Sequence, residues 1–179
     1  MEISELVDEC RKGKQNAQLE LYRRYYKAMY NISYRIVYDA MESEDIMQEA
    51  FLTAFTRLDE LQESEAFGGW LKRIVVNKSL SAYRKRGNNL EVPLENVEYG
   101  LSAEDATVEI NSSTLDKSSI MQAMQKLKDS YRVILSLHLI EGYDHEEICE
   151  ILSITYANCR TMLSRAKNNL RKELQVFLN

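Results

Sequence analysis

EGYDHEEICEILSITYANCRTMLSRAKNNLRKEL, residues 141–174, is the stretch that decides the fold of this chain. Asp144 and Glu147 are spaced as a capping box, which predicts the start of a short helix. A tight turn follows around Ser153, and Thr155 can cap a longer helix over 156–177. The apolar residues of this second helix recur every three or four positions: Cys159, Leu163, Ala166, Leu170 and Leu174. Two helices joined by such a turn predict a helix-turn-helix motif.

The two helices of the motif differ in charge. The first is acidic and would avoid phosphates, whereas residues 156–172 carry five basic side chains and no acidic one. Arg and Asn are side chains that read guanine and adenine edges in the major groove. We therefore expect DNA contacts from the exposed face of the second helix, an ordinary hairpin with a solvated basic face being the alternative. The residues of that face are Tyr156, Asn158, Arg160, Thr161, Ser164, Arg165 and Lys167.

Helical periodicity also dominates the rest of the chain outside residues 88–116. With one proline and six glycines, the composition argues against a sheet-rich fold and favours an all-α one. Asn16 and Ser43 are the expected N-caps of two helices, residues 61–69 are expected to form a loop, and Gly142 ends the last helix before the motif. Helices are predicted over residues 16–38, 43–58, 70–85 and 120–137, after a short helix that precedes Gly13.

Charge is divided unevenly along the chain, whose formal net charge is -5. Residues 1–90 hold 14 acidic and 14 basic side chains, residues 91–116 hold seven acidic and no basic ones, and residues 117–179 hold seven acidic and nine basic ones. The acidic middle part also lacks helical periodicity, which is typical of a linker. We therefore predict two small helical domains, over 1–88 and 117–179, joined by a flexible acidic linker over 89–116.

Two further stretches suggest binding surfaces. AFGGWLKRIVVNKSLSAYRKR, at 66–86, interleaves aromatic residues with six basic ones. Rings stack on unpaired bases while cations hold the backbone, so single-stranded DNA is one expected ligand. On periodicity alone, Phe67 and Trp70 fit core residues better than base-contacting ones. Residues 42–65 carry eight acidic side chains against one basic one, and they are interpreted either as a solvated face or as a docking surface for a basic partner.

Other classes of protein find little support in the sequence. It has no GxxxxGK[ST], GxGxxG or GxSxG motif, so neither an enzyme with catalytic residues nor a cofactor is expected. His145 and Cys149 are one helical turn apart, but no further ligands accompany them, so no metal site is expected. No apolar run is long enough to span a membrane, and the acidic N-terminus lacks a signal core. We expect a cytosolic protein with reduced cysteines.

Four stretches, taken together, carry a family resemblance over nearly the whole chain. They are AQLELYRRYYKAMYNIS at 17–33, ESEDIMQEAFLTAF at 42–55, and the stretches already quoted at 66–86 and 141–174. In order and spacing they resemble the extracytoplasmic-function (ECF) group of bacterial RNA polymerase sigma factors. The resemblance implies a factor that binds core RNA polymerase and directs promoter-specific transcription initiation. It also implies promoter DNA and an anti-sigma factor as partners, and an acidic linker that threads polymerase channels.

The resemblance further implies roles for single positions. Docking on the polymerase is implied for Asp45, Ile46, Gln48, Glu49 and Phe51. Residues 62–67 fall in the loop that captures a flipped base, and contacts to the minus-ten element are implied for Ser64, Phe67, Trp70, Lys72, Arg73, Asn77, Arg84 and Lys85. Contacts to the minus-thirty-five element are implied for the basic helix that begins at Tyr156. Ser153 stands where the family usually has the glycine of the turn, which costs little unless the position needs a positive φ angle.

A stand-alone helix-turn-helix regulator is the alternative from a different class. Its first 90 residues would bind an effector or a dimer partner. Such a regulator needs neither the acidic stretch at 42–65 nor the aromatic and basic stretch at 67–86, so these two stretches favour the sigma factor.

Overall fold

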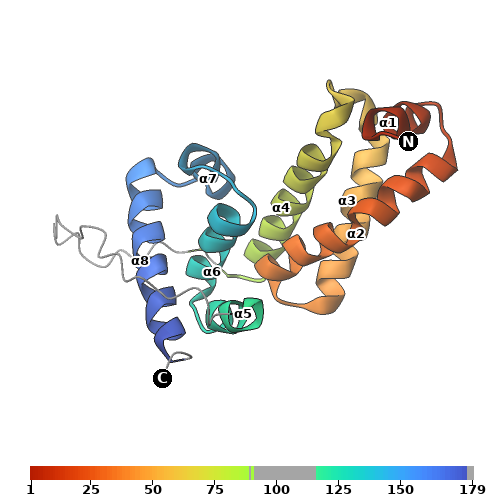
Figure 1. Cartoon of the computed structure of the whole chain (residues 1–179). Helices are drawn as coiled ribbons and strands as arrows, with labels where there is room; N and C mark the ends of the chain where they lie inside the picture. Colours follow the sequence, from red (N-terminus) through yellow and green to blue (C-terminus); the bar gives the residue numbers. More distant parts are fainter. Residues whose placement is uncertain (89, 91–115, 177–179) are drawn as a thin grey trace. The chain divides into compact units, whose positions relative to one another are not determined.

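The computed structural model describes residues 1–88, 90 and 116–176, and its helices belong to two compact units, Met1–Asn89 and Leu90–Asn179 (Figure 1). No strand occurs in this described part of the chain, so the predicted all-α fold with two helical domains is confirmed. The predicted linker lies outside the described residues except at Leu90 and Asp116. None of the described helices is long and apolar enough to cross a membrane.

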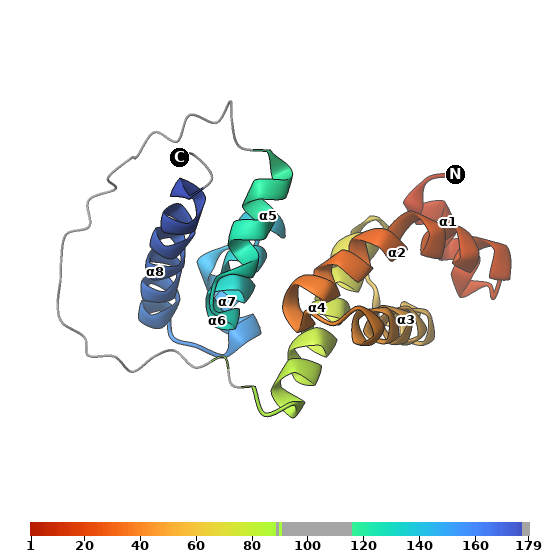
Figure 2. The same cartoon turned by 90° about the horizontal axis from the view of Figure 1, so that it is seen from below.

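Unit 1 is a bundle in which three long helices pack against one another. Helix α2 contacts both α3 and α4, α3 contacts α4, and the short helix α1 lies against α2 (Figure 2). Two 3-10 turns, η1 and η2, connect α3 to α4. In chain order the elements are α1 (Ile3–Arg11), α2 (Gln15–Val37), α3 (Ala40–Thr56), η1 (Leu58–Glu60), η2 (Ser64–Ala66) and α4 (Phe67–Lys85).

The core of unit 1 forms where the apolar faces of these helices meet. Burying a large apolar side chain stabilises a fold by about 1.5–3 kcal/mol, so the core supplies the main driving force. Ser33 of α2 and Ser79 of α4 are buried within it. Ser79 Oγ lies 3.0 Å from Ser33 Oγ and 2.8 Å from the carbonyl oxygen of Val75, so these buried hydroxyls are hydrogen-bonded. Fully buried side chains include Leu21, Ile36, Ala50, Leu71, Val75 and Leu80.

Helices α2 and α4 are in close contact at the start of α4. A Cβ atom on Gly68 would lie 2.9 Å from Cε1 of Tyr25 on α2, so a larger residue would displace the tyrosine ring. Next to it, Phe67 is fully buried, and its ring centroid lies 5.6 Å from that of Tyr25 and 6.3 Å from that of Trp70. This aromatic contact packs the first turn of α4 against α2.

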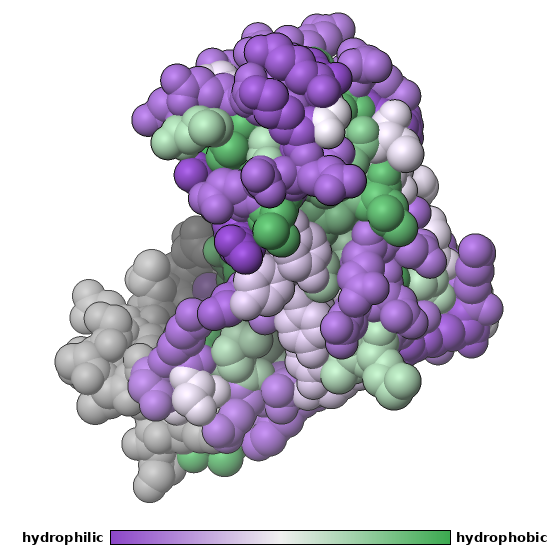
Figure 3. Space-filling view, turned by 90° about the vertical axis from the view of Figure 1, so that its right-hand side faces the viewer, coloured by the Kyte–Doolittle hydropathy of each residue, from purple (hydrophilic) through white to green (hydrophobic). Residues whose placement is uncertain are grey.

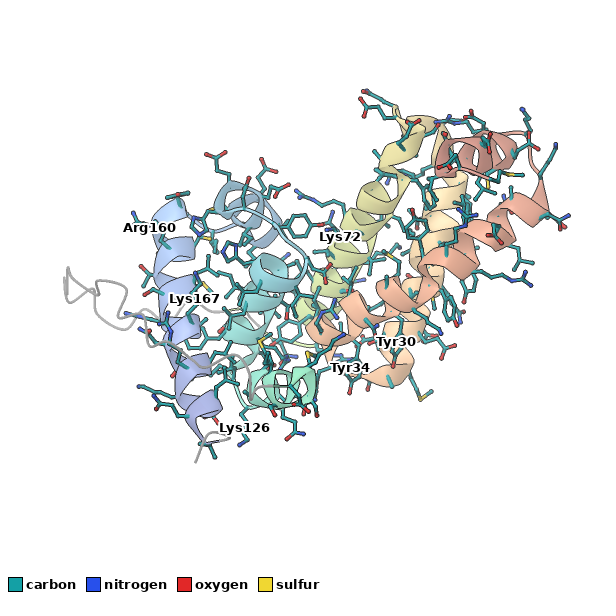
Figure 4. All side chains as sticks on the ribbon, in the orientation of Figure 1. Tyr30, Tyr34, Lys72, Lys126, Arg160 and Lys167 are labelled. Carbon is teal, nitrogen blue, oxygen red and sulfur yellow. The ribbon has the colours of Figure 1, made fainter. Side chains whose placement is uncertain are left out.

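Tyrosines spaced four residues apart form a row along α2. The ring centroids of Tyr22 and Tyr26 are 5.5 Å apart and the rings stack. The rings of Tyr30 and Tyr34, which Figure 4 labels, stack at 6.0 Å. Side chains at this spacing share one face of a helix. Tyr38 ends the helix in the left-handed region, with φ 55°, and its ring lies 5.2 Å from that of Tyr34.

Hydrophilic residues cover most of the face shown in Figure 3, with hydrophobic residues between them.

Unit 2 is a second helical bundle that contains the helix-turn-helix. Helix α8 packs on α5, α6 and α7, and the side chains between them make the core. The elements are α5 (Lys117–Gln125), α6 (Asp129–Leu135), a π-helical turn η3 (Ser136–Ile140), α7 (His145–Leu152) and α8 (Tyr156–Gln175). Fully buried residues include Ile134, Leu135, Leu137, Ile148, Cys159 and Ala166.

The predicted capping residues of the helix-turn-helix are confirmed. Asp144 Oδ1 accepts a hydrogen bond from the Glu147 amide at 2.8 Å, and Glu147 Oε2 accepts one from the Asp144 amide at 2.9 Å. This reciprocal pair is the capping box of α7. Thr155 Oγ1 accepts a hydrogen bond from the Asn158 amide at 3.2 Å and so caps α8.

Two predicted caps in unit 1 were wrong. Helix α2 begins at Gln15, after Lys14 as its N-cap, so Asn16 already lies inside the helix. Helix α3 is capped by Asp39, whose Oδ1 accepts a hydrogen bond from the Glu42 amide at 2.8 Å. Ser43 is buried one turn further on, and its hydroxyl donates to the Asp39 carbonyl oxygen. Several polar residues near each helix start can serve as caps, so the local sequence does not single one out.

Two predicted element boundaries also differ from the structure. The loop predicted over 61–69 contains η2, and α4 begins at Phe67 rather than at Trp70. The single helix predicted over 120–137 is divided into α5 and α6, because Lys128 adopts an extended conformation with ψ 145°. Apolar residues keep their phase across this break, since Leu127 is buried like its helical neighbours, so periodicity alone did not reveal it.

The turn between α7 and α8 requires a positive φ angle. Ser153 is the C-cap of α7 with φ 56° and ψ 48°, and its amide donates to the Cys149 carbonyl oxygen. The left-handed conformation costs a residue with a Cβ atom about 1–2 kcal/mol. The serine at this position is therefore strained, although it is exposed.

Ser153→Gly should stabilise the protein. The relieved strain exceeds the additional unfolded-state entropy of glycine, about 0.4–1 kcal/mol, so the expected gain is about 0.5–1 kcal/mol. For a unit of this size that raises Tm by about 2–8 °C in thermal unfolding followed by circular dichroism. Gly142→Ala is the matched control and should lower Tm. Gly142 has φ +77°, so alanine would be strained there, and the open space around it excludes a steric clash as the cause. An unchanged or lower Tm for Ser153→Gly would contradict the strain at this turn.

Candidate nucleic-acid interface

The exposed half of α8 carries the residues predicted to contact DNA. Tyr156, Asn158, Arg160, Thr161 and Ser164 are exposed, while Arg165 and Lys167 are half-buried. The opposite half is buried in unit 2 through Cys159, Met162, Leu163 and Ala166. The structure therefore keeps all seven predicted residues out of the core.

These residues form two rows on the exposed half of α8. Successive residues of an α-helix are rotated by about 100°. Asn158, Thr161 and Arg165 consequently lie on one side, and Arg160, Ser164 and Lys167 lie on the other. Figure 4 marks Arg160 and Lys167, which are two turns apart along the helix. One row offers amide, hydroxyl and guanidinium groups suited to base edges, and the other offers two cations suited to phosphates.

The first residue of α8 is held against α7 by a stack of rings. His138 and His145 stack at 5.3 Å, and the Tyr156 ring lies edge-on to His145 at 5.7 Å. The Tyr156 hydroxyl and His145 Nδ1 are 3.5 Å apart, and His138 Nδ1 is 3.0 Å from the Tyr143 carbonyl oxygen. His145 therefore belongs to a packing contact that orients Tyr156. Within residues 1–88, 90 and 116–176 no three His, Cys, Asp or Glu side chains gather as a metal site.

Cysteine thiols in both units are held in the protonated form. Burial raises the pKa of Cys10 to about 11. Burial, with a further contribution from the neighbouring Cys149, raises the pKa of Cys159 to about 11. Cys159 Sγ lies 3.8 Å from the His145 carbonyl oxygen, so it packs the start of α8 against α7. All three cysteines are free.

On α4, four of the predicted DNA-contacting residues share one face. Trp70, Arg73, Asn77 and Arg84 are spaced by three, four and seven residues, which places them in a row along the helix. Trp70 and Arg73 are half-buried, whereas Asn77 and Arg84 are exposed. The predicted contacts Lys72 and Lys85 lie off this row, and Figure 4 marks Lys72 on α4.

Three predicted site residues lie in the core instead. Phe67 is 0% exposed, so its ring packs inside unit 1 and is not presented to a base. Ile46 and Phe51 on α3 are 6% and 3% exposed, so they support that helix from beneath. Each of these helices has one face that packs in the core and one face that is exposed. A family motif includes residues of both faces, so it cannot by itself separate the contact residues from the buried residues that support them.

The exposed face of α3 is acidic, and cations of α4 border it. Asp45, Gln48 and Glu49 are exposed, and a groove between the two helices is lined by Asp45 and Glu49 on one side and by Lys78 and Arg86, among others, on the other. Lys78 Nζ lies 3.5 Å from Glu49 Oε2. The acidic face is thus partly neutralised from within the unit.

Arg86 is occupied by contacts inside unit 1, although it belongs to the basic stretch. Its guanidinium forms an ion pair with Glu42 of α3 and donates a hydrogen bond to the Val37 carbonyl oxygen at 3.1 Å. These contacts join the end of α4 to the connection between α2 and α3. Sequence reasoning could not separate Arg86 from its basic neighbours, because the difference depends on which carboxylate lies opposite.

Comparisons with known proteins match both units. Residues 21–89 match the family model Sigma-70 region 2, and residues 117–170 match Sigma-70, region 4. The chain is 30% identical to the ECF RNA polymerase sigma factor SigW of Bacillus subtilis, with 98% of each chain covered. It is 28% identical to the RNA polymerase sigma-H factor of Pseudomonas aeruginosa, over 97% of this chain and 94% of the relative.

Solved structures agree in fold. CnrH in complex with the cytosolic domain of CnrY gives a TM-score of 0.58 at 19% identity, with 97% of both chains covered. The sigma factor RpoE of Bartonella quintana, in complex with the anti-sigma factor NepR, also gives a TM-score of 0.58, at 21% identity. The match covers 88% of this chain and 96% of RpoE. A stand-alone regulator would not share both sigma regions in this order. The chain therefore belongs to the ECF family of RNA polymerase sigma factors, proteins without enzymatic activity of their own that direct transcription initiation.

Proposed function

We propose that this sigma factor divides its work between three exposed helix faces. Helix α3 docks on core RNA polymerase, α4 with the 61–66 loop engages the minus-ten element, and α8 reads the minus-thirty-five element. The observation that carries the proposal is the separation of charge, with exposed acids on α3 and exposed or half-buried cations on α4 and α8. Screening limits the reach of each charge to about 8–10 Å at cellular salt, so each face selects its own partner despite the net negative charge.

The proposed docking face consists of Asp45, Gln48 and Glu49. Their side chains are exposed, and the resemblance assigns this segment to the clamp helices of the largest polymerase subunit. Ile46 and Phe51 contribute indirectly, by holding α3 in the unit 1 core. Complementary charge across an interface raises the rate of encounter and suppresses wrong partners.

The proposed minus-ten surface combines the row on α4 with the preceding loop. Trp70 can stack on an unpaired base while Arg73 and Arg84 hold the backbone, and Asn77 offers an amide for a base edge. Lys72 and Lys85 extend the positive surface to either side. Ser64 lies in the loop that the resemblance assigns to base capture, and buried Phe67 anchors the end of that loop.

The domain limits are proposed as 1–88 and 117–179, with the acidic segment between them as a linker. Asp116, the last residue of that segment, caps α5 with its carboxylate. Its Oδ1 accepts hydrogen bonds from the Ser119 amide and hydroxyl, each at 2.8 Å, and these bonds lower its pKa below the ordinary value. The other six carboxylates of the segment suit a polymerase channel that is built for nucleic acid.

An anti-sigma factor is the proposed regulatory partner, and the cytosol is the proposed location. Two structural neighbours were solved as CnrH with the cytosolic domain of CnrY and as RpoE with the anti-sigma factor NepR. The shared fold makes a similar complex feasible for this chain. A protein that binds both RNA polymerase and promoter DNA has to be in the compartment that contains them, which is the cytosol.

Asp45→Arg combined with Glu49→Arg should abolish most of the affinity for core polymerase. Positive charge then faces a basic clamp, and like-charge contacts at an interface cost several kcal/mol, so binding should weaken about tenfold or more. The measurement is a titration of labelled sigma factor with core enzyme. Asp59→Arg with Glu60→Arg, an equal charge change at exposed sites in η1, is the control. If the Asp45→Arg, Glu49→Arg variant binds core polymerase as tightly as wild type does, the acidic face of α3 is only solvated.

Arg165→Ala and Lys167→Ala should affect upstream recognition differently. Loss of a base contact at Arg165 should cost about 1–3 kcal/mol at the preferred base and relax selectivity there. Loss of a phosphate contact at Lys167 should weaken binding evenly and reduce the log-log salt slope by about one unit. Holoenzyme binding to a randomised upstream element at several salt concentrations measures both effects. A uniform loss across sequences for Arg165→Ala would reassign Arg165 to phosphate binding.

A further inference from the structure

The loop before α4, residues 61–66, is tied to the N-terminal helix by a single arginine. Arg11, the last residue of α1, donates from Nη2 to the Leu61 carbonyl oxygen at 2.6 Å and from Nη1 to Ser64 Oγ at 3.0 Å. The same Nη1 lies 2.9 Å from Asp8 Oδ1, and the Ser64 hydroxyl is 3.3 Å from that oxygen. One guanidinium thus holds two points of the loop, and Asp8 closes the network.

The chemistry of arginine suits this task. Its planar fork offers several N–H groups in fixed directions, so two acceptors three residues apart in the chain are held at a defined separation. A lysine ammonium has no such fork. The Ser64 hydroxyl accepts from Arg11 and faces Asp8, so its orientation is set before any ligand arrives.

Helix α1 is itself firmly placed. Leu6, Val7 and Cys10 are buried, and the helix packs against α2 and against both 3-10 turns, η1 and η2. It lies before residue 21, where the match to Sigma-70 region 2 begins. The next residue, Lys12, makes a contact of a different kind, since its Nζ pairs with Glu9 of the same helix at 3.0 Å.

We propose that Arg11 is a positioning residue that presets the 61–66 loop for base selection in the minus-ten element. The proposal rests on the function proposed above for that loop. A preset loop loses less conformational freedom when it takes up a base, and it admits fewer alternative base poses. Arg11 therefore sharpens discrimination between bases without touching DNA.

The test is a binding selection with reconstituted holoenzyme. The probe is a fork DNA whose upstream duplex is fixed and whose single-stranded minus-ten segment is randomised, and the bound pool is sequenced. Arg11→Ala should reduce base preference at one or two minus-ten positions by about three- to tenfold, equivalent to about 0.7–1.4 kcal/mol. Arg11→Lys should rescue little, because it restores the charge but not the fork. Lys12→Ala should keep the wild-type preference.

Hydrogen exchange on the protein alone gives a readout that is independent of DNA. Amides of residues 61–66 should exchange faster in Arg11→Ala than in wild type, while amides of the α2 and α4 core keep their protection. Unchanged exchange in the loop would overturn the positioning role. Unchanged base preference would also overturn it, and so would an affinity loss that is equal for all sequences, which indicates a general loss of stability.

Trp70→Ala separates this inference from the proposed function beneath it. If Trp70→Ala lowers minus-ten selectivity and Arg11→Ala does not, only the role of Arg11 fails. If neither variant changes selectivity while the Arg11 variant loosens the loop, the assignment of the minus-ten surface fails, and the inference falls with it. Reduced selectivity in both the Trp70→Ala and the Arg11→Ala variants, with the Lys12→Ala control unchanged, supports the minus-ten surface and the positioning role of Arg11.

Discussion

The contact between the start of α4 and the middle of α2 is the constraint on which unit 1 depends. Gly68 allows the two helices to approach, because a Cβ there would meet the Tyr25 ring at 2.9 Å. Phe67 fills the space beside it and is fully buried. This contact determines where the 61–66 loop ends and which side of α4 faces outward. The row from Trp70 to Arg84, whose first two residues are half-buried, and the loop in front of it are both supported by that packing arrangement.

Charge in this protein acts locally rather than through its sum. A net charge of -5 would disfavour DNA binding if it were spread evenly. Instead, acids are exposed on α3, and cations gather on α4 and α8. Some of these charges are satisfied inside the protein, as in the Lys78–Glu49 and Arg86–Glu42 pairs. Exposed ion pairs contribute about 0–1 kcal/mol to stability. Glu49 can therefore leave Lys78 and contact a binding partner at little cost.

The two units use the same device to present functional side chains. In each, a helix buries an apolar stripe and carries recognition groups on the opposite half, so packing and recognition do not compete for the same residues. In unit 2 the turn before α8 is strained at Ser153 and capped by Thr155, and ring stacking on His145 orients Tyr156. In unit 1 the corresponding support comes from α1, whose Arg11 holds the loop ahead of α4.

The sequence by itself determined the all-α class, the helix-turn-helix with its caps at Asp144 and Thr155, and the family, because these depend on local periodicity, capping chemistry and motif order. It did not reveal the break between α5 and α6, since apolar phase continues across it. Nor did it separate exposed Asp45 from buried Phe51, or the surface cations from Arg86, which is paired with Glu42. The network of Arg11, Leu61 and Ser64 joins residues about 50 positions apart. Only the tertiary structure decided these features, because burial and long-range partners depend on which helices pack together.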